Sequence, residues 1–104
     1  MDQDTVLKTV RQFKKALESS NIEIEQLIIF GSHADGTARE DSDIDLVVIS
    51  PSFSDKSYWE RIDILTEAIY KVLAPIEASA FTPEEWKTGN SLIVDYAKNG
   101  VLVK

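Results

Sequence analysis

The stretch GSHADGTAREDSDIDLVVIS, residues 31–50, decides the fold that this sequence predicts. Gly31 and Ser32 follow the apolar run LIIF, and Asp43 and Asp45 stand just before the apolar run LVVI. Short apolar runs bounded by turn residues predict strands, and a continuous run predicts burial on both faces. We therefore expect two strands joined by a polar loop with one helical turn near its start. A Gly-Ser turn lies at one end of that loop and a pair of carboxylates at the other.

Apolar residues at helical spacing precede this stretch, at Val6, Val10, Phe13 and Leu17. They predict an amphipathic helix over residues 5–17.

Capping boxes predict two later helix starts, Ser57 with Glu60 and Thr82 with Glu85. The first of these helices is expected to bury one face, made of Tyr58, Ile62, Leu65, Ile69 and Val72. The expected order is helix 5–17, strand 24–30, strand 43–50, helix from Ser57, strand 75–81, helix from Thr82, helix from about Ser91 to a left-handed turn at Asn99-Gly100, and edge strand 101–103. This order predicts an α/β (α+β) fold.

Composition limits the possible classes of protein. The 104 residues include 18 acidic and 11 basic side chains, a net charge of −7. This length predicts a single domain over residues 1–104. The acidic excess argues against non-specific nucleic-acid binding and predicts an acidic surface that suits a basic partner. The absence of cysteine excludes disulfides and thiolate metal sites. With neither a secretory signal nor a membrane-length apolar run, we expect a cytoplasmic protein.

Asp43 and Asp45 carry the strongest chemical signal. Residues two apart in a strand point to the same face, about 6.6 Å apart along the chain. Two carboxylates aimed at one volume repel unless a proton or a cation offsets their charge. Mg²⁺ prefers oxygen ligands, and two ions can clamp the entering and leaving oxygens of a phosphoryl transfer. The alternative is a solvated strand end, because Asp-Ser-Asp is also common in turns.

Gly31, Ser32 and Glu77 are further candidates. Gly31 lets the backbone approach a ligand or adopt a positive φ, and Ser32 with the following amides can cradle phosphate oxygens. Gly-Ser is also an ordinary turn. Glu77 is a charge in a small, apolar strand, so it needs a partner or solvent. It is either a third metal ligand that can also take a proton from an attacking hydroxyl, or an exposed edge-strand residue.

The spacing Gly31-Ser32, ten residues, Asp43-Ile44-Asp45 reproduces the GSx10DxD signature of the DNA polymerase beta-like nucleotidyltransferases. The segments GTAREDSDIDLVV and FTPEEW closely resemble the minimal nucleotidyltransferase (MNT) proteins of that superfamily, and the resemblance covers nearly the whole chain. It implies a mixed, mostly antiparallel sheet backed by helices. It also implies transfer of AMP from ATP to an acceptor hydroxyl, with release of pyrophosphate.

Carried over by position, the resemblance implies roles for five residues. Gly31 and Ser32 would hold the triphosphate, Asp43 and Asp45 would bind two Mg²⁺ ions, and Glu77 falls where the family has its third acid, most often Asp.

The loop start departs from the family pattern. Many relatives resemble Gly-Ser-Arg-Ala-Arg-Gly there, whereas this chain has His33-Ala34-Asp35 in the middle positions. His33 is either a replacement donor for the triphosphate or a solvated loop residue. Arg39 is the nearest remaining cation, or a surface residue paired with a neighbouring acid.

The resemblance also implies a partner. Small members of this type resemble antitoxins paired with HEPN-domain toxin ribonucleases, in which the transferase can adenylylate a tyrosine of the toxin. Larger relatives add an acceptor-binding domain, and 104 residues leave no room for one, so the acceptor is expected on a separate molecule. Two alternatives stay open: a catalytically weak or inactive module that neutralises its partner by contact, and a small-molecule nucleotidyltransferase.

Overall fold

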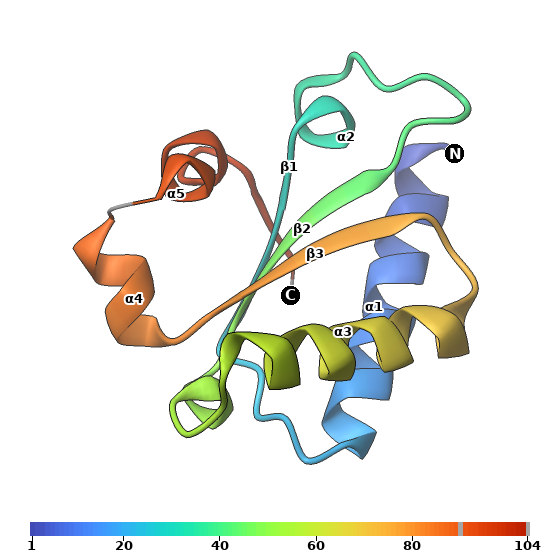
Figure 1. The fold of residues 1–104 in the computed structure, drawn as a ribbon. Helices are drawn as coiled ribbons and strands as arrows, with labels where there is room; N and C mark the ends of the chain where they lie inside the picture. Colours follow the sequence, from blue (N-terminus) through green and yellow to red (C-terminus); the bar gives the residue numbers. More distant parts are fainter. Residues whose placement is uncertain (90, 104) are drawn as a thin grey trace.

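A computed structural model describes residues 1–89 and 91–103 of the chain. Its centre is a four-stranded sheet in the order β3-β2-β1-β4 (Figure 1). The strands are β1 (Gln26–Phe30), β2 (Ile44–Ile49), β3 (Ile76–Phe81) and β4 (Val101–Val103). Strand β1 pairs antiparallel with both β2 and β4, and β2 pairs parallel with β3. The prediction of a mixed, mostly antiparallel sheet is confirmed.

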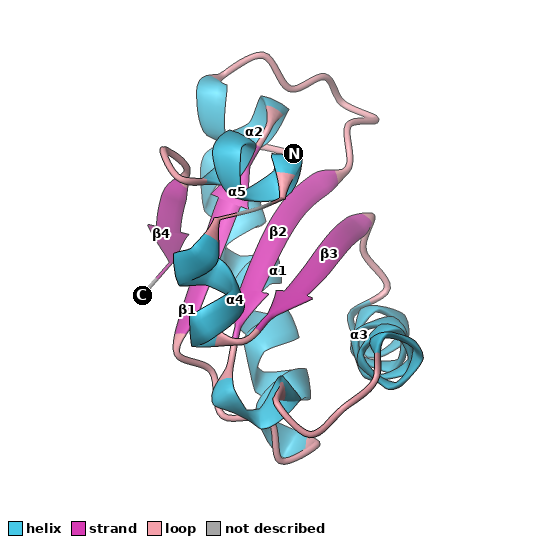
Figure 2. Ribbon diagram, turned by 60° about the vertical axis from the view of Figure 1, so that its left-hand side comes forward, coloured by secondary structure: helices cyan, strands magenta, loops and turns pink. Residues whose placement is uncertain are grey.

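Helices cover both faces of this sheet (Figure 2). Helices α1 (Gln3–Ser19) and α3 (Tyr58–Val72) pack on one face, and the short helices α4 (Pro83–Thr88) and α5 (Leu92–Ala97) pack on the other. Alternate residues of β2 are therefore buried against different helices, Leu46 and Val48 on the α1 side and Val47 and Ile49 on the α5 side.

The long apolar runs form the elements that they predict. In α1, the four residues at helical spacing are at most 1% exposed, and the Asp2 carboxylate caps the helix by accepting from the Thr5 N–H at 2.8 Å. Strand β2 has neighbours on both edges and helices on both faces, which explains its continuous apolar run. Strand β1 is two residues shorter at its start than expected, because pairing with β2 begins at Gln26.

Both capping boxes are present. The hydroxyl of Ser57 accepts from the Glu60 N–H at 3.2 Å, and Thr82 and Glu85 form the second box at the start of α4. The prediction for Tyr58 is wrong: this residue is 68% exposed. It stands in the first turn of α3, two turns before the buried Leu65, where the helix extends past the core.

The helix end at Gly100 also differs from its prediction. Gly100 has no positive φ, so α5 does not end in a left-handed turn there. Glycine is needed for another reason: a Cβ at Gly100 would overlap the carbonyl oxygen of Ile29 and lie 2.7 Å from Cγ2 of Ile28. The chain crosses β1 too closely for any side chain at this position.

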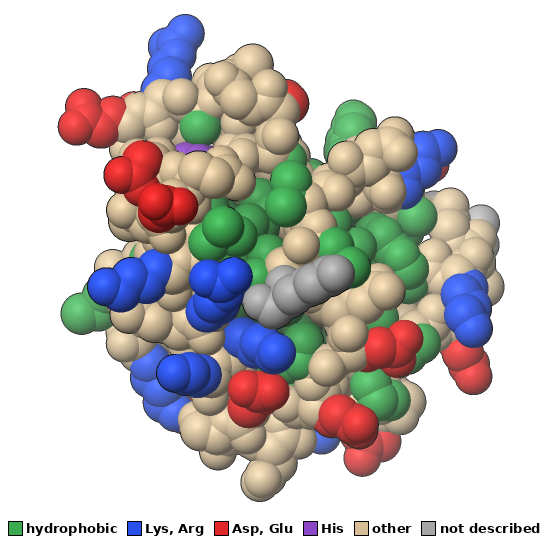
Figure 3. Space-filling view, turned by 180° about the vertical axis from the view of Figure 1, so that it is seen from behind, with side chains coloured by type: hydrophobic (Ala, Val, Ile, Leu, Met, Phe, Trp, Pro, Cys, Tyr) green, Lys and Arg blue, Asp and Glu red, His purple; other side chains and the backbone are tan. Residues whose placement is uncertain are grey.

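Charged side chains are unevenly distributed over the surface. Lys and Arg gather on part of the face opposite to that of Figure 1 (Figure 3). The expectation of an acidic surface is therefore wrong for this face, because the acidic excess lies elsewhere. Among the described helices, none has the length and hydropathy that a membrane span requires.

Candidate active site

The pairing of β2 with β3 brings two of the predicted acids together. Asp45 and Glu77 are register partners in the parallel ladder, so they are neighbours on the same face of the sheet. Asp43 lies one residue before β2 and two residues from Asp45. The predicted third carboxylate is thus supplied by the strand adjacent to the Asp pair.

Proximity to the Asp pair perturbs the pKa of Glu77. The pKa of the Glu77 carboxyl is raised, first by its side-chain hydrogen bond with Asp45 and then by the negative charge of Asp45. Partial desolvation and the charge of Asp43 raise this pKa further. A third negative charge is unfavourable at this site, and a bound proton or cation would reduce the repulsion between the carboxylates.

The donor chemistry of this cluster fits a hard cation, because all three side chains offer carboxylate oxygens. The side chains do not form a closed ligand set as they stand. In residues 1–89 and 91–103, no three His, Cys, Asp or Glu side chains are placed to hold one ion. The strand register makes Asp45 and Glu77 neighbours, whereas ion binding would need the carboxylate oxygens to converge further.

The backbone at Gly31 lies directly against the carboxylate of Asp45. Its φ of 73° and ψ of −149° lie in a region that is essentially restricted to glycine. A Cβ at Gly31 would overlap Oδ2 of Asp45 and stand 3.3 Å from its Cγ. The positive φ expected of this glycine is confirmed. Its backbone closely approaches the Asp45 carboxylate, whereas its approach to a ligand stays a prediction.

A hollow of about 450 Å³ opens beside this contact. Gly31 and Asp45 line it together with three residues from the far end of the chain, Tyr96, Asn99 and Gly100. Ser32, the first residue of α2 (Ser32–Asp35), is half-buried and is not among the lining residues. Of the two predicted triphosphate residues, the structure thus places Gly31 in this hollow.

Sequence reasoning missed Tyr96 and Asn99. They come from the end of α5, which lies beside β1 only because β4 returns the chain to the sheet. The Asn99-Gly100 pair is typical of a helix end, but it does not indicate the close approach of Gly100 to β1.

His33 has neither of its predicted roles. It is 7% exposed, and its Nε2 lies 3.1 Å from the carbonyl oxygen of Ser42. A ring nitrogen facing a carbonyl must donate, so His33 fastens α2 to the end of the loop. Arg39 is exposed, and within the described part of the chain it forms no ion pair. Asp35 closes its own turn by accepting from Thr37, which lowers the pKa of Asp35.

Comparisons with known proteins bear on the family and the fold of this chain. A model of the family described as "Nucleotidyltransferase domain" matches residues 10–100. No curated protein sequence matches the chain.

Two solved structures share the fold. One is a Sulfolobus solfataricus protein provisionally assigned as a nucleotidyltransferase, with a TM-score of 0.71 and 23% identity over 96% of this chain and 80% of that one. The other is a chain from a toxin–antitoxin structure with AMP-PNP, with a TM-score of 0.60 and 16% identity over 100% of this chain and 73% of that one. The family match spans both sides of the site, from α1 through the Asp pair and Glu77 to Gly100, and on it we conclude that this chain belongs to the nucleotidyltransferase domain family.

Proposed function

We propose that this chain transfers AMP from ATP to a hydroxyl group on a partner protein in a Mg²⁺-dependent reaction. The observation that carries the proposal is the contact between Gly31 and Asp45, with Glu77 beside them on the next strand. A glycine that no side chain can replace and three neighbouring carboxylates support a site for phosphate and cation.

Each side chain has a defined task in this reaction. Asp43 and Asp45 would hold Mg²⁺, and Glu77 would complete the ligand set. When bound, the metal would neutralise charge on the phosphates and polarise the α-phosphate. The acceptor oxygen forms a bond to the α-phosphorus, the bond to the β-phosphate oxygen breaks, and pyrophosphate leaves. Glu77 is the candidate to receive the hydroxyl proton.

For the partner, we propose a HEPN-type toxin whose tyrosine is the acceptor. The structural similarity to a chain crystallised in a toxin–antitoxin assembly with AMP-PNP supports this choice. The resemblance to the small nucleotidyltransferases supports it independently. The use of ATP would put the reaction in the cytoplasm.

The test is a labelling assay with the purified chain, the partner toxin, Mg²⁺ and ATP labelled on the α-phosphate. Label should pass to the toxin, and the Asp43→Asn/Asp45→Asn variant should abolish transfer. A toxin Tyr→Phe variant at the acceptor should abolish labelling without weakening the complex. An intact toxin that stays unlabelled by the wild-type chain would refute the proposal.

A second candidate is a module that neutralises its partner by contact alone. It is favoured by two observations: the carboxylates do not form a ready ligand set, and His33 is committed to Ser42 instead of replacing a basic triphosphate contact. Under this function, the Asp43→Asn/Asp45→Asn variant would still bind the toxin and suppress toxicity. Loss of suppression in a variant that keeps the complex would exclude it.

A further inference from the structure

Strand β3 has a free outer edge. It is the last strand of the sheet, and β2 donates to the carbonyls of Pro75 at 2.8 Å and Phe81 at 2.9 Å. In a parallel ladder, every second residue of a strand directs both its N–H and its C=O toward the same neighbouring strand. In β3, the odd-numbered residues direct these groups toward β2. The N–H and C=O groups of Ala78 and Ala80 therefore point outward, away from the sheet.

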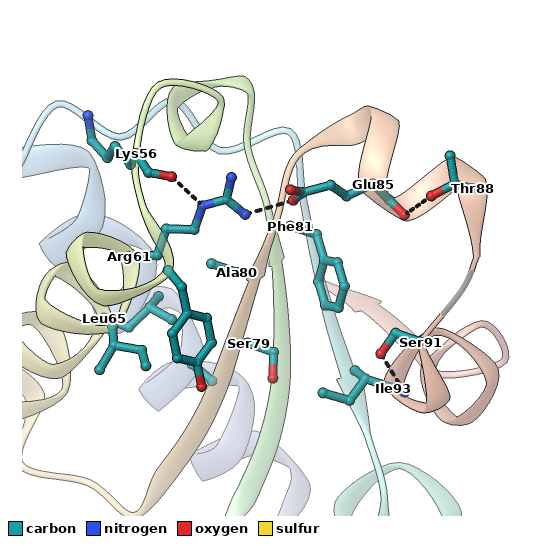
Figure 4. A pocket seen from close by; sticks show the side chains of 13 residues that line it. Lys56, Arg61, Leu65, Ser79, Ala80, Phe81, Glu85, Thr88, Ser91 and Ile93 are labelled. Carbon is teal, nitrogen blue, oxygen red and sulfur yellow. Dashed lines mark hydrogen bonds and ion pairs between the residues drawn. The ribbon is translucent and has the colours of Figure 1, made fainter.

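This edge opens into a groove of about 680 Å³. Figure 4 shows the edge of β3 between two walls, with Leu65 of α3 on one side and Phe81 and Ile93 on the other. Ala78 and Ala80 line its floor. Their small side chains leave the outward backbone groups accessible from the groove.

One end of the groove is closed by an ion pair, and the other end lies next to Glu77. Where β3 ends, Arg61 of α3 donates to Glu85 of α4 at 2.7 Å and links the two walls (Figure 4). Arg61 is held there by a second bond, to the carbonyl oxygen of Phe53 at 2.8 Å. At the other end, the first β3 residue of the groove, Ala78, directly follows Glu77.

An edge of this kind is unusual in a protein that must avoid edge-to-edge association. Exposed edges are normally protected by lysine, proline, a bulge or a covering element. Pro75 and Glu77 lie at the start of β3, whereas residues 78–81 include no charged residue and no proline. The missing protection is expected if the edge is a binding surface.

We propose that this groove binds an extended peptide segment of the acceptor protein, which adds to β3 as a further strand and brings its hydroxyl residue to Glu77. The inference rests on the proposed function and specifies how its acceptor is recognised. A peptide fits the outward groups better than a small molecule, because Ala78 and Ala80 present donors and acceptors at the two-residue repeat of a strand. Alternate side chains of the added strand would contact the α3 wall and the Phe81–Ile93 wall.

The test uses a synthetic peptide of alternating threonine and valine with a central tyrosine, without ATP or Mg²⁺. Its binding to the ¹⁵N-labelled chain is followed by NMR. The amide signals of Ala78 and Ala80 should shift on titration and their hydrogen exchange should slow. The same peptide N-methylated on the amides of one edge should bind at least about tenfold more weakly.

Two groove variants and one control variant test the same groove from the protein side. Ala80→Pro removes an outward N–H that β2 does not use, and Ile62→Asp puts a charge on the apolar α3 wall. Each should weaken peptide binding at least about tenfold, which corresponds to about 1.4 kcal/mol. Thr66→Asp is the matched control for Ile62→Asp, because Thr66 is exposed one turn further along α3 and does not line the groove. It should change binding less than about threefold.

The outcomes separate this inference from the proposed function. Absence of peptide binding, or equal binding to wild type, Ala80→Pro and Ile62→Asp, overturns the inference even if AMP transfer is observed. A concentration-dependent dimer of the free chain that Ala80→Pro abolishes also overturns it, in favour of a second copy at this edge. Peptide binding with shifts at Ala78 and Ala80 supports it even if the labelling assay fails, because binding is measured without nucleotide.

Discussion

Replacing Gly31 by alanine tests the contact on which the site depends. The backbone at Gly31 occupies a glycine-only region, which costs about 1–3 kcal/mol for other residues. The new Cβ would also overlap Oδ2 of Asp45, so either the carboxylate or the start of α2 must move. A displacement of about 1 Å at a reacting site can cost about 100-fold in rate. We therefore expect Gly31→Ala to lower AMP transfer by about 100-fold or more.

Gly36→Ala is the matched control. Gly36 also has a positive φ, 83°, but no atom lies within 4 Å of a Cβ built there. Alanine in this left-handed conformation costs about 1–2 kcal/mol without touching the acids. Urea unfolding should show both variants destabilised, whereas only Gly31→Ala should lose transfer in the labelling assay. Wild-type transfer by Gly31→Ala, or an equal loss in Gly36→Ala, would refute the reasoning.

Three further predictions concern other contacts. The raised pKa of Glu77 means that the folded chain holds this proton more tightly than the unfolded chain, so stability is lost as pH rises above the ordinary Glu value near 4.5. Glu77→Gln should therefore raise the Tm of the metal-free chain at pH 7 but not at pH 4, and an equal effect at both would contradict the cause. Arg61→Ala should cost about 2–3 kcal/mol in urea unfolding, because Glu85 and the Phe53 carbonyl lose a charged donor, and Arg61→Lys should restore less than half. His33→Leu should cost about 1–3 kcal/mol by leaving the Ser42 carbonyl without its donor, whereas wild-type stability would mean that this bond is dispensable.

Sequence patterns could predict the sheet because its central strand is determined by local composition. The run LVVI in β2 must be buried on both faces, and the alternation of strands places Asp45 toward the same face as its partner on β3. As a lone charge in an apolar strand, Glu77 could be singled out from the sequence, but its role as a third metal ligand rests on the family resemblance and stays a prediction. Local periodicity was sufficient to predict an element wherever residues nearby in the sequence determine which side chains are buried.

The remaining contacts depend on the path of the chain and not on local patterns. His33 is polar and lies in a polar loop, and only the return of that loop to Ser42 makes it a buried donor. Tyr96 reaches the hollow beside Gly31 because α5 and β4 bring the end of the chain back to β1. No pattern within a few residues of either side chain encodes such a return, so neither role could be read from the sequence.

The arrangement of hollows around the carboxylates bears on the chemistry of the proposed transfer. Asp45 lines the 450 Å³ hollow on the β1 side of β2, and Glu77 adjoins the groove at the outer edge of β3. Phosphoryl transfer requires the attacking and leaving oxygens to lie roughly in line, so donor and acceptor must approach from opposite sides. The sheet order fits this requirement, because β1 and β3 lie on opposite sides of β2, and the hollow and the groove lie beside them. A one-residue slip between β2 and β3 would turn Glu77 to the other face and remove both the third carboxylate and the link to the groove. The parallel register is thus the feature on which the proposed donor site, acceptor groove and proton acceptor jointly depend.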